Sequence, residues 1–263
     1  TRSGSVTGVQ TCALPIFTSF LTEGQRLPPL ILIERPGGAS DALAGKAGFQ
    51  ALASAREIGA QGDALEAFTL YQQLADSLSA AGIGMNLGPS VTACPDDGAA
   101  PDCFGSEPLH SAAFATAFNL AHQSRGVLTG LRYVPRSGGL AALYEIMKRK
   151  APDALIIGDD LEMAKTLRLA RYSGAIILDS AAEAGRPRVG PILADTLRRS
   201  ADMVLLRGRA DLSGADLAAV RSAIDTGALS QARIEDAARR AGVLRMQLKS
   251  TRSQFASQIG ASQ

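Results

Sequence analysis

The sequence predicts an α/β protein built on parallel strands. From residue 30 onward, short apolar runs alternate with longer stretches of helical period, and Gly, Pro, Asp or Ser bounds each run. The runs are almost continuously apolar, as strands covered on both faces are. Regular alternation of such strands with helices indicates parallel pairing, in a doubly wound layer or in a barrel. Periodicity alone does not choose between the two. No strand is followed by a G-x-G-x-x-G or Walker glycine motif, which weakens a nucleotide-binding layer.

Six strands are expected, at residues 29–34, 83–87, 127–133, 154–158, 174–178 and 203–206. The first long helix has Asp63 at the N-cap position with Glu66 three residues later, and Gly82 ends it. Its apolar stripe comprises Phe68, Tyr71, Leu74, Ala75 and Leu78. The remaining gaps predict helices at residues 110–122 and 140–150.

The last helix is expected to begin at Ser230. Its apolar stripe consists of Ile234, Ala237, Ala241, Leu244 and Leu248. Three arginines, Arg239, Arg240 and Arg245, fall on the opposite side, where a solvated helix face is the usual explanation. Nucleic-acid binding by these arginines is the lesser alternative.

Bulk composition excludes several classes of protein. Of the 263 residues, 46% are hydrophobic and 20% are charged, which is too apolar for a disordered chain. The net charge of +2, with no basic stripe interleaved with aromatics, gives no argument for nucleic acid as a partner. No apolar run approaches the roughly 18 residues of a membrane span. We therefore expect neither a nucleic-acid partner nor a membrane span.

The amino-terminal residues need separate treatment. Residues 6–16, VTGVQTCALPI, resemble the translation of a common sequencing-library adapter. We therefore interpret residues 1–16 as translated adapter and residues 17–263 as one domain. A natural amino-terminal strand is the alternative. Under the adapter interpretation, any signal peptide would be invisible and Cys12 leaves the cysteine count.

Cys94 and Cys103 bracket a loop rich in Pro, Gly and Asp. This spacing permits a disulfide in an oxidising compartment without requiring one, and two free thiols are an equal alternative. Two cysteines are too few for a structural zinc site. We expect no metal and no cofactor.

Seven segments resemble motifs of one enzyme family. GDDLEM (158–163) resembles the S-D-D-L-E-M segment of bacterial β-N-acetylglucosaminidases of glycoside hydrolase family 3. The others follow the family's order along the chain: LILIERPGG (30–38), AGIGMNLGPS (81–90), DCFGSEP (102–108), RYVPRSG (132–138), SADMVLL (200–206) and GALSQARIEDAARR (227–240). The resemblance runs from Phe17 to Lys249, so the sequence is identified as a divergent and truncated member of this family, similar to its amino-terminal domain.

The resemblance implies a single-domain, incomplete TIM-like (β/α) barrel with its site at the carboxyl ends of the strands. It implies retaining hydrolysis of β-N-acetylglucosaminides such as peptidoglycan fragments, in which a carboxylate attacks the anomeric carbon and a second group acts as acid and then base. Asp159 matches the nucleophile and Asp160 a structural partner. Without the family, we would interpret this acidic pair as a helix N-cap. The other matched positions predict substrate binding by Glu34, Asp102, Arg132 and Tyr133.

Several of these positions depart from the family pattern. Glu34 replaces an Asp, Asp102 replaces an Arg, and Arg132 replaces a Lys. The remaining departures are Pro36 for a Glu, Thr92 for an Asp, and Tyr133 and Ser137 for two histidines. Gly37 and Gly38 of the first motif are kept, which preserves its turn. Most hydrogen-bonding groups that hold a sugar in the family are thus changed.

A deletion is more serious for catalysis. The Asp-Ser-His loop that supplies the family's acid/base histidine is absent, together with one strand–helix unit, so the helix at 140–150 should lead directly into the nucleophile strand. His110 and His122 are expected at the surface or at a helix flank. A missing acid/base costs about 10²–10⁴ in rate, although Glu34 could serve as a substitute if it faced Asp159.

Three functional hypotheses remain. The first is a glycosidase whose activity is reduced or altered. The second is a catalytically silent barrel that binds a saccharide or a protein partner. The third is a fragment created by assembly. The family resemblance favours a cytoplasmic protein, whereas a bridge between Cys94 and Cys103 would favour a location outside the cytoplasm.

Overall fold

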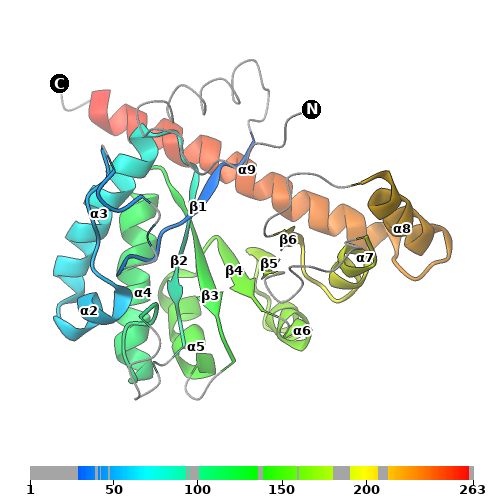
Figure 1. The fold of residues 1–263 in the computed structure, drawn as a ribbon, viewed down its shortest axis with the longest axis horizontal. Helices are drawn as coiled ribbons and strands as arrows, with labels where there is room; N and C mark the ends of the chain where they lie inside the picture. Colours follow the sequence, from blue (N-terminus) through cyan, green and yellow to red (C-terminus); the bar gives the residue numbers. More distant parts are fainter. Residues whose placement is uncertain are drawn as a thin grey trace. The chain divides into compact units, whose positions relative to one another are not determined.

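Strands and helices alternate along the chain (Figure 1). The computed structural model describes residues 29–38, 41, 43–46, 48–92, 94, 101–135, 139–158, 160–179, 190–206 and 213–260, of which Leu161 and residues 254–260 are described by their backbone only. The predicted α/β class with parallel strands is confirmed. The adapter-like residues 1–16 lie outside the described residues, so the proposed start of the domain stays a prediction.

All six predicted strands are present, with bounds that differ from the expected ones by a few residues. They are β1 Leu32–Glu34, β2 Met85–Ser90, β3 Leu128–Tyr133, β4 Ala154–Ile157, β5 Ala175–Asp179 and β6 Met203–Leu205. Strands β2, β4 and β5 are buried along their whole length. Coverage on both faces is the physical reason for the apolar sequences of β4 and of residues 175–178 in β5.

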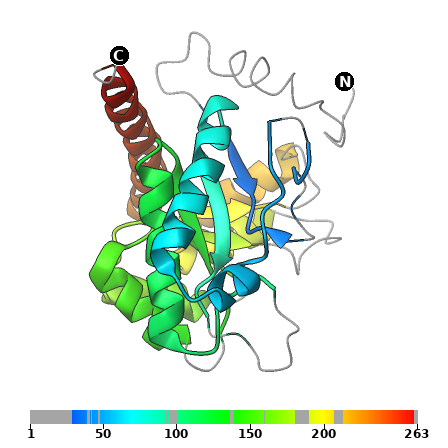
Figure 2. The same cartoon turned by 90° about the vertical axis from the view of Figure 1, so that its left-hand side faces the viewer.

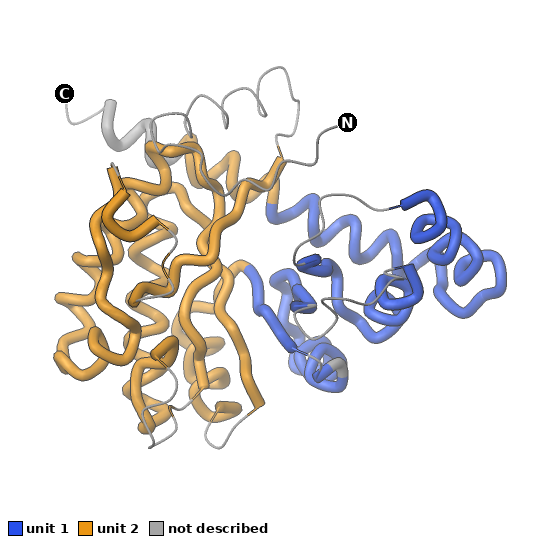
Figure 3. Tube along the Cα trace, in the orientation of Figure 1, with its two compact units in different colours: residues 1–5, 154–244 blue, residues 6–153, 245–263 orange. Residues whose placement is uncertain are grey.

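The chain forms two compact units, which Figure 3 distinguishes by colour. Of the described residues, the β1–β3 unit contains those up to 153 and those from 245 onward, and the β4–β6 unit contains residues 154–244. Within the first, β1 pairs with β2 and β2 with β3; within the second, β4 pairs with β5 and β5 with β6. Every one of these pairings is parallel, so the carboxyl ends of the strands in each unit share one edge.

Four helices accompany the strands of the β1–β3 unit: α2 Ala55–Ala60, α3 Ala64–Ala80, α4 Pro108–Gln123 and α5 Gly139–Lys150. Helix α4 packs between α3 and α5 and also contacts β2 and β3 (Figure 2). The predicted N-cap is confirmed, because the Asp63 carboxylate accepts the backbone N–H groups of Leu65 at 2.7 Å and Glu66 at 3.4 Å. At the other end of α3, Gly82 has a φ of +76°, a conformation that favours glycine.

Aromatic side chains form the core of this unit. Tyr71 of α3 and Phe118 of α4 meet edge to face with ring centroids 5.1 Å apart. Phe104 and Phe114 stack beside them at 5.6 Å, and all four residues are at most 1% exposed. Such rings supply much of the buried apolar area of a domain. The helix predicted at residues 110–122 is present as part of α4 and contributes Phe114 and Phe118 to the core.

The β4–β6 unit carries helices α6 Leu161–Leu169, α7 Gly190–Arg198, α8 Gly214–Asp225 and the first half of α9 Gln231–Gly260. Asp202, immediately before β6, joins two strands through its backbone and its side chain. Its N–H donates to the Ile176 carbonyl at 2.8 Å, and its carboxylate accepts the Ile176 N–H at 2.9 Å. Asp202 thereby sets the register at the amino ends of β5 and β6.

Helix α9 follows the predicted stripe, since Ala237, Leu244 and Leu248 are buried. The prediction of a solvated face for its arginines is correct for Arg239, whose side chain is 68% exposed. It is wrong for Arg240, which donates to the Asp236 carboxylate at 3.2 Å and to the Ser173 carbonyl at 3.1 Å. The Ser173 carbonyl is a long-range acceptor, which periodicity does not reveal, and it draws this side chain inward.

Only residues 151–153 separate α5 from β4. The predicted direct entry from this helix into the strand before Asp159 is therefore confirmed, with no strand–helix unit between them. Among the described residues, no helix is long and apolar enough to cross a bilayer.

Candidate functional site

The carboxyl ends of β1 and β3 carry two of the predicted site residues. Glu34 is the last residue of β1, and Arg132 is the penultimate residue of β3. Ser90, the last residue of β2, lies opposite Arg132 in the strand register. The carboxyl ends of parallel strands are the edge at which α/β proteins bind their ligands. This edge of the β1–β3 unit is the candidate site.

Glu34 and Arg132 form an ion pair between Oε1 and Nη2. The pair spans β2, because β1 and β3 each pair with that strand. Neighbouring strands lie about 4.8 Å apart, so the two backbones are separated by roughly 10 Å and both side chains must be long. Glutamate, one methylene longer than aspartate, suits that span. The side chains are 33% and 24% exposed, respectively, so polar groups of both remain near solvent.

A bulge in β2 places Arg132 at this edge. The register between β2 and β3 shifts between Leu87 and Ser90, and the two intervening residues are Gly88 and Pro89. Proline cannot donate to a ladder hydrogen bond and is tolerated at such a bulge. A Cβ at Gly88 would stand 2.3 Å from the Phe118 ring, so only glycine allows this close approach of strand and helix. Past the bulge, the Val91 N–H donates to the Arg132 carbonyl at 2.9 Å.

A buried ion pair anchors the chain just after β1. The Arg35 Nε donates to both oxygens of Asp41 at 2.9 and 2.8 Å, and the two side chains are 1% and 0% exposed. The Arg35 guanidinium also donates to the Gln50 carbonyl and lies 5.2 Å from the Phe49 ring centroid. Removing one partner of such a pair leaves an uncompensated buried charge, which is strongly destabilising. The pair therefore holds the loop that follows Glu34.

Asn86 of β2 and His122 of α4 are both buried and extend the hydrogen-bond network that begins at Arg35. The Asn86 Oδ1 accepts the Arg35 N–H at 3.1 Å, and its Nδ2 lies 3.0 Å from His122 Nε2. The other ring nitrogen of His122 lies 2.9 Å from the Phe118 carbonyl. A carbonyl only accepts, so Nδ1 carries the proton and Nε2 accepts from Asn86. Each polar group in this network thus has a partner.

His122 is fully buried, so the prediction of a surface histidine is wrong for this residue. Desolvation lowers the pKa of His122 to about 4, and the hydrogen bond to the Phe118 carbonyl offsets only part of that shift. The imidazole is therefore neutral at pH 7. Its position four residues after Phe118, on the buried stripe of α4, is the sequence signal that indicates burial.

His110 occupies a half-buried position at the start of α4. Its Nε2 lies 3.0 Å from the Gly59 carbonyl, and its ring centroid is 4.6 Å from that of Phe114. The expectation of a helix-flank position is confirmed for this histidine. Its contacts are structural and lie within the helical layer.

Two other predicted substrate-binding residues adjoin the strand ends differently. Asp102 is half-buried, and its carbonyl accepts the Ser90 N–H at 2.6 Å, which places it beside the end of β2. Tyr133 is 3% exposed, and a Cβ at Gly139 would stand 3.5 Å from its ring. The ring is thus enclosed rather than open to solvent. Substrate binding by Asp102 and Tyr133 stays a prediction.

Thr92 fills the position of a family aspartate in the interior. It is 1% exposed, and its hydroxyl contacts that of Ser90. A Cβ at Gly139 would come within 2.6 Å of the Thr92 methyl group. This residue therefore packs under the start of α5, where a methyl group suits the site better than a charge.

A disulfide joins Cys94 and Cys103, with their Cα atoms 5.4 Å apart. It resolves the alternative between a bridge and two free thiols. Cys103 also forms a parallel bridge with Ser90. The cross-link therefore attaches the loop that carries Asp102 to the end of β2.

The predicted nucleophile, Asp159, lies outside the described residues. Its neighbour Asp160 is described and serves as the N-cap of α6, with its carboxylate accepting the Met163 N–H at 3.1 Å. The N-cap interpretation of the acidic pair is thus confirmed for Asp160, whereas its role as a structural partner of Asp159 stays a prediction. Asp159 therefore falls, by sequence, between the end of β4 and this cap. Among the described residues, no three His, Cys, Asp or Glu side chains are grouped as a metal site.

No family model and no curated protein match the sequence. Solved structures do match the fold. A β-N-acetylglucosaminidase of glycoside hydrolase family 3 from Paenibacillus sp. superposes with a TM-score of 0.78 and 21% identity over 92% of this chain and 55% of its own. A β-N-acetylhexosaminidase from Beutenbergia cavernae superposes with a TM-score of 0.76 and 20% identity, over 93% of this chain and 87% of its own. A family 3 glycosyl hydrolase from Mycobacterium smegmatis superposes with a TM-score of 0.75 and 18% identity, over 89% of this chain and 85% of its own.

The chain thus spans most of some of these structures and about half of others. The prediction of an incomplete TIM-like barrel is confirmed, since the match covers about nine-tenths of the chain and the described residues contribute six strands. At these identities the similarity establishes the fold. The chain has the (β/α) barrel fold of the family 3 glycoside hydrolases.

Proposed function

We propose that this chain is a family 3 glycoside hydrolase-like protein that binds β-N-acetylglucosaminides and whose hydrolytic turnover is reduced or lost. The observation that carries the proposal is the Glu34–Arg132 ion pair at the carboxyl ends of β1 and β3. In barrels of this kind, that edge holds the ligand. The structural neighbours that hydrolyse β-N-acetylglucosaminides support the choice of sugar.

The ion pair offers suitable chemistry for sugar hydroxyls. A carboxylate accepts from a hydroxyl, and a guanidinium donates to its oxygen, so a vicinal diol can be bound by both groups at once. Glu34 and Arg132 are partly exposed and already held in a fixed geometry by each other. Binding to a preorganised pair costs less side-chain entropy than ordering two mobile chains. Asp102, beside the end of β2, is a third candidate contact.

The proposed reaction is the family's retaining hydrolysis, with Asp159 as nucleophile. Its carboxylate would attack the anomeric carbon while the bond to the leaving oxygen breaks, and water would then hydrolyse the glycosyl-enzyme. The leaving oxygen needs a proton unless it leaves as a stable anion. His122 is buried and neutral, and His110 belongs to the α4 layer, so neither histidine is a candidate acid. Loss of a general acid typically costs about 10²–10⁴ in rate.

Leaving-group ability therefore separates the candidate functions. If only the acid is missing, 2,4-dinitrophenyl β-N-acetylglucosaminide should be hydrolysed measurably, because its phenolate leaves without protonation. The corresponding methyl glycoside and N,N′-diacetylchitobiose should be cleaved far more slowly. Asp159→Ala should abolish all turnover, and Glu145→Gln in the middle of α5, where Glu145 pairs with Lys148, should leave it unchanged. Equal rates for the activated and alkyl substrates would contradict the missing acid.

A silent saccharide-binding barrel is the second candidate, and the direct connection from α5 to β4 favours it. It predicts no hydrolysis of any glycoside, with saturable binding of N,N′-diacetylchitobiose by calorimetry that Glu34→Gln weakens. Absence of both hydrolysis and saccharide binding in folded protein would overturn both candidates. A chain without a cooperative unfolding transition would support the third hypothesis, an assembly-made fragment.

We further propose a location outside the reducing cytoplasm. The Cys94–Cys103 bridge supports it, because disulfides persist in oxidising compartments. Peptidoglycan fragments, which carry N-acetylglucosamine, are accessible there. Alkylation of protein isolated without reductant should leave these two cysteines unmodified, whereas modification of both would contradict the proposed compartment.

A further inference from the structure

A second, strongly basic cavity lies in the β4–β6 unit, away from the carboxyl ends of its strands. It has a volume of about 520 Å³ and opens where the chain leaves α6 and α7 to enter β5 and β6, at the amino ends of those strands. Five arginines line it: Arg168, Arg171, Arg233, Arg239 and Arg240. The proposed glycosidase function uses none of them.

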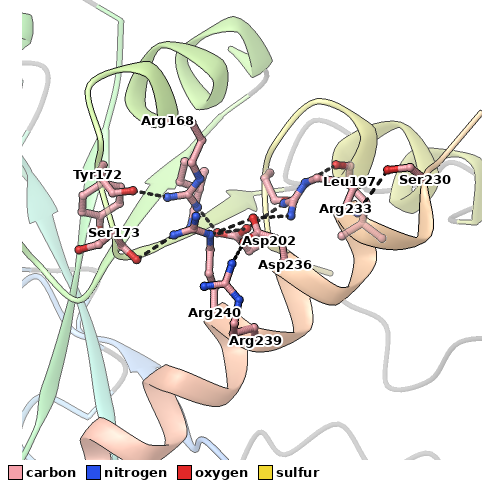
Figure 4. Close-up of polar contacts among 12 residues, drawn as sticks. Arg168, Tyr172, Ser173, Leu197, Asp202, Ser230, Arg233, Asp236, Arg239 and Arg240 are labelled. Atoms are coloured by element: carbon pink, nitrogen blue, oxygen red, sulfur yellow. Dashed lines mark hydrogen bonds and ion pairs between the residues drawn. The ribbon is translucent and has the colours of Figure 1, made fainter.

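Two carboxylates face these guanidinium groups. Asp202 pairs with Arg168 and Arg233, and Asp236 pairs with Arg233, Arg239 and Arg240 (Figure 4). Among the described residues, five cations against two anions leave a surplus of three positive charges around this cavity. Like charges around one cavity repel one another, and the repulsion is strongest where solvent is partly excluded.

Some of the arginines have structural partners. Arg233 donates to the carbonyls of Leu197 at 3.0 Å and Ala201 at 2.7 Å, which fixes α9 against the end of α7. Arg168 donates to the carbonyls of Tyr172 at 2.6 Å and Gly174 at 2.9 Å. These contacts explain why both guanidinium groups are held in place. They do not neutralise the excess charge.

Arg168 retains unmet hydrogen-bonding capacity. Its Nε is buried and has no hydrogen-bond partner. Burial lowers the pKa of this guanidinium, and the positive charges of Arg240 and Arg233 lower it further, against the opposing effect of Asp202. A buried donor without an acceptor is costly and calls for an explanation, such as an ion or water that completes the site.

Two cavity residues adopt backbone conformations that side chains disfavour. Arg171 has a φ of +61° and Ser200 a φ of +76°, and they are the only non-glycine residues with positive φ in the described part of the chain. Each follows a helix end, where glycine is common. At position 171, an arginine is used instead and lies on the cavity wall, where its side chain makes no ion pair among the described residues. Strained residues of this kind cluster at functional sites.

We propose that this cavity binds a small oxyanion of the phosphate class, either inorganic or as a phosphomonoester. The surplus of three charges matches a multivalent anion better than a single carboxylate. Guanidinium forks donate pairs of parallel hydrogen bonds to tetrahedral oxyanions. The cavity has room for a diphosphate with its bridging water. Arg168 and Arg233, which pair with Asp202, form the fixed wall of the cavity. Arg171 and Arg239 are the arginines that can donate further hydrogen bonds to a ligand.

Calorimetric titration of the full chain tests this site. Inorganic pyrophosphate and glycerol 3-phosphate should each bind saturably at one site, and their relative affinities distinguish a free anion from a phosphomonoester. Arg171→Gly should weaken binding roughly ten- to hundredfold, the equivalent of one charge-assisted contact. Glycine adopts the positive φ at this position freely, so the thermal midpoint should stay the same or rise. Loss of binding would then not reflect unfolding.

Arg198→Ala provides the charge-matched control. Arg198 pairs with Asp195 on the surface of α7 and does not line the cavity, so pyrophosphate affinity should change less than twofold. Arg239→Ala is a second cavity variant that should weaken binding in the same direction as Arg171→Gly. If all three variants weakened pyrophosphate binding equally, the binding would reflect nonspecific charge and the proposal would be overturned. Equal competition by chloride at matched ionic strength would lead to the same conclusion. Absence of binding would overturn it directly.

Discussion

Glu34 and Arg132 form an ion pair across β2, at the ends of two strands that each pair with β2. Aspartate and lysine stand at these positions in the family pattern, so both side chains differ from it. The longer acid and the forked base reach each other over the intervening strand. This pairing joins two positions that are predicted to bind sugar into one preformed polar unit. A substitution of either residue therefore removes the ion-pair partner of the other.

We expect a small coupling energy between these two residues. A double-mutant cycle with Glu34→Gln and Arg132→Gln should give a coupling of about 0.2–1 kcal/mol in urea unfolding, because the pair is partly exposed. The coupling should decrease when salt is raised, as expected for screened charges. A coupling above about 3 kcal/mol would indicate a desolvated pair and contradict the exposed geometry.

Stability should fall in mild acid because of His122. Its folded-state pKa of about 4 lies below the ordinary value of 6.5, so the unfolded state binds more protons between these two pH values. The free energy of unfolding should therefore decrease as pH falls through this window, by at most about 3 kcal/mol for this group. Urea unfolding at a series of pH values measures the effect.

His122→Gln is the matching control for this pH dependence. Glutamine offers a donor and an acceptor to the Phe118 carbonyl and to Asn86, but does not titrate. The variant should be less stable at pH 7 and should show a flatter profile between pH 4 and 6.5. Asp153, whose pKa is raised by burial, contributes equally to both proteins. Parallel profiles for the two proteins would show that His122 does not titrate as described.

A methyl group at Gly88 should disrupt the bulge that positions Arg132. The added Cβ would meet the Phe118 ring at 2.3 Å, so Gly88→Ala should destabilise the protein by about 1–3 kcal/mol through overpacking. Gly214→Ala at the start of α8 meets nothing within 4 Å and should be neutral or slightly stabilising. Thermal unfolding of the two variants checks the difference. Equal midpoints would argue against the tight contact between β2 and α4.

Reduction of the disulfide should destabilise the β1–β3 unit. Cys94 and Cys103 are nine residues apart, and closing a loop of this size contributes about 2–3 kcal/mol in the chain-entropy description. Unfolding with and without a phosphine reductant measures the loss. The double variant with alanine at both positions should lose the same stability and become insensitive to the reductant. An effect of reductant on that variant would assign the change to another group.

Local sequence patterns were sufficient for the elements. Strands β4 and β5 follow apolar runs and are buried along their whole length, and the N-caps at Asp63 and Asp160 use side chains that bind the first backbone amides of their own helices. These interactions connect residues a few positions apart, so they are visible along the chain. The resemblance to the family implies the missing unit between α5 and β4, because the motif at 132–138 is followed by a single helix before β4.

The partners of charged and polar side chains could not be predicted. His122 and Asn86 are buried together although 36 residues separate them, and Arg240 reaches Ser173 over 67 residues. Whether a polar group is solvated depends on which distant backbone groups are brought beside it, and periodicity carries no such information. Glu34 was expected at the site, but its pairing with Arg132 depends on strand order and on the bulge in β2.

The sequence alone determined the succession of strands and helices, the direct entry into β4 and the chemical identity of the residues at the strand ends, because these follow from short-range periodicity and capping. Tertiary structure alone decided which of those residues meet. In the folded chain Tyr133 is buried, and burial lowers the pKa of His122 so that it is neutral at pH 7. Cys94 and Cys103 form a disulfide, and five arginines line one cavity. Burial and electrostatic pairing depend on distances in space, which the folded backbone sets.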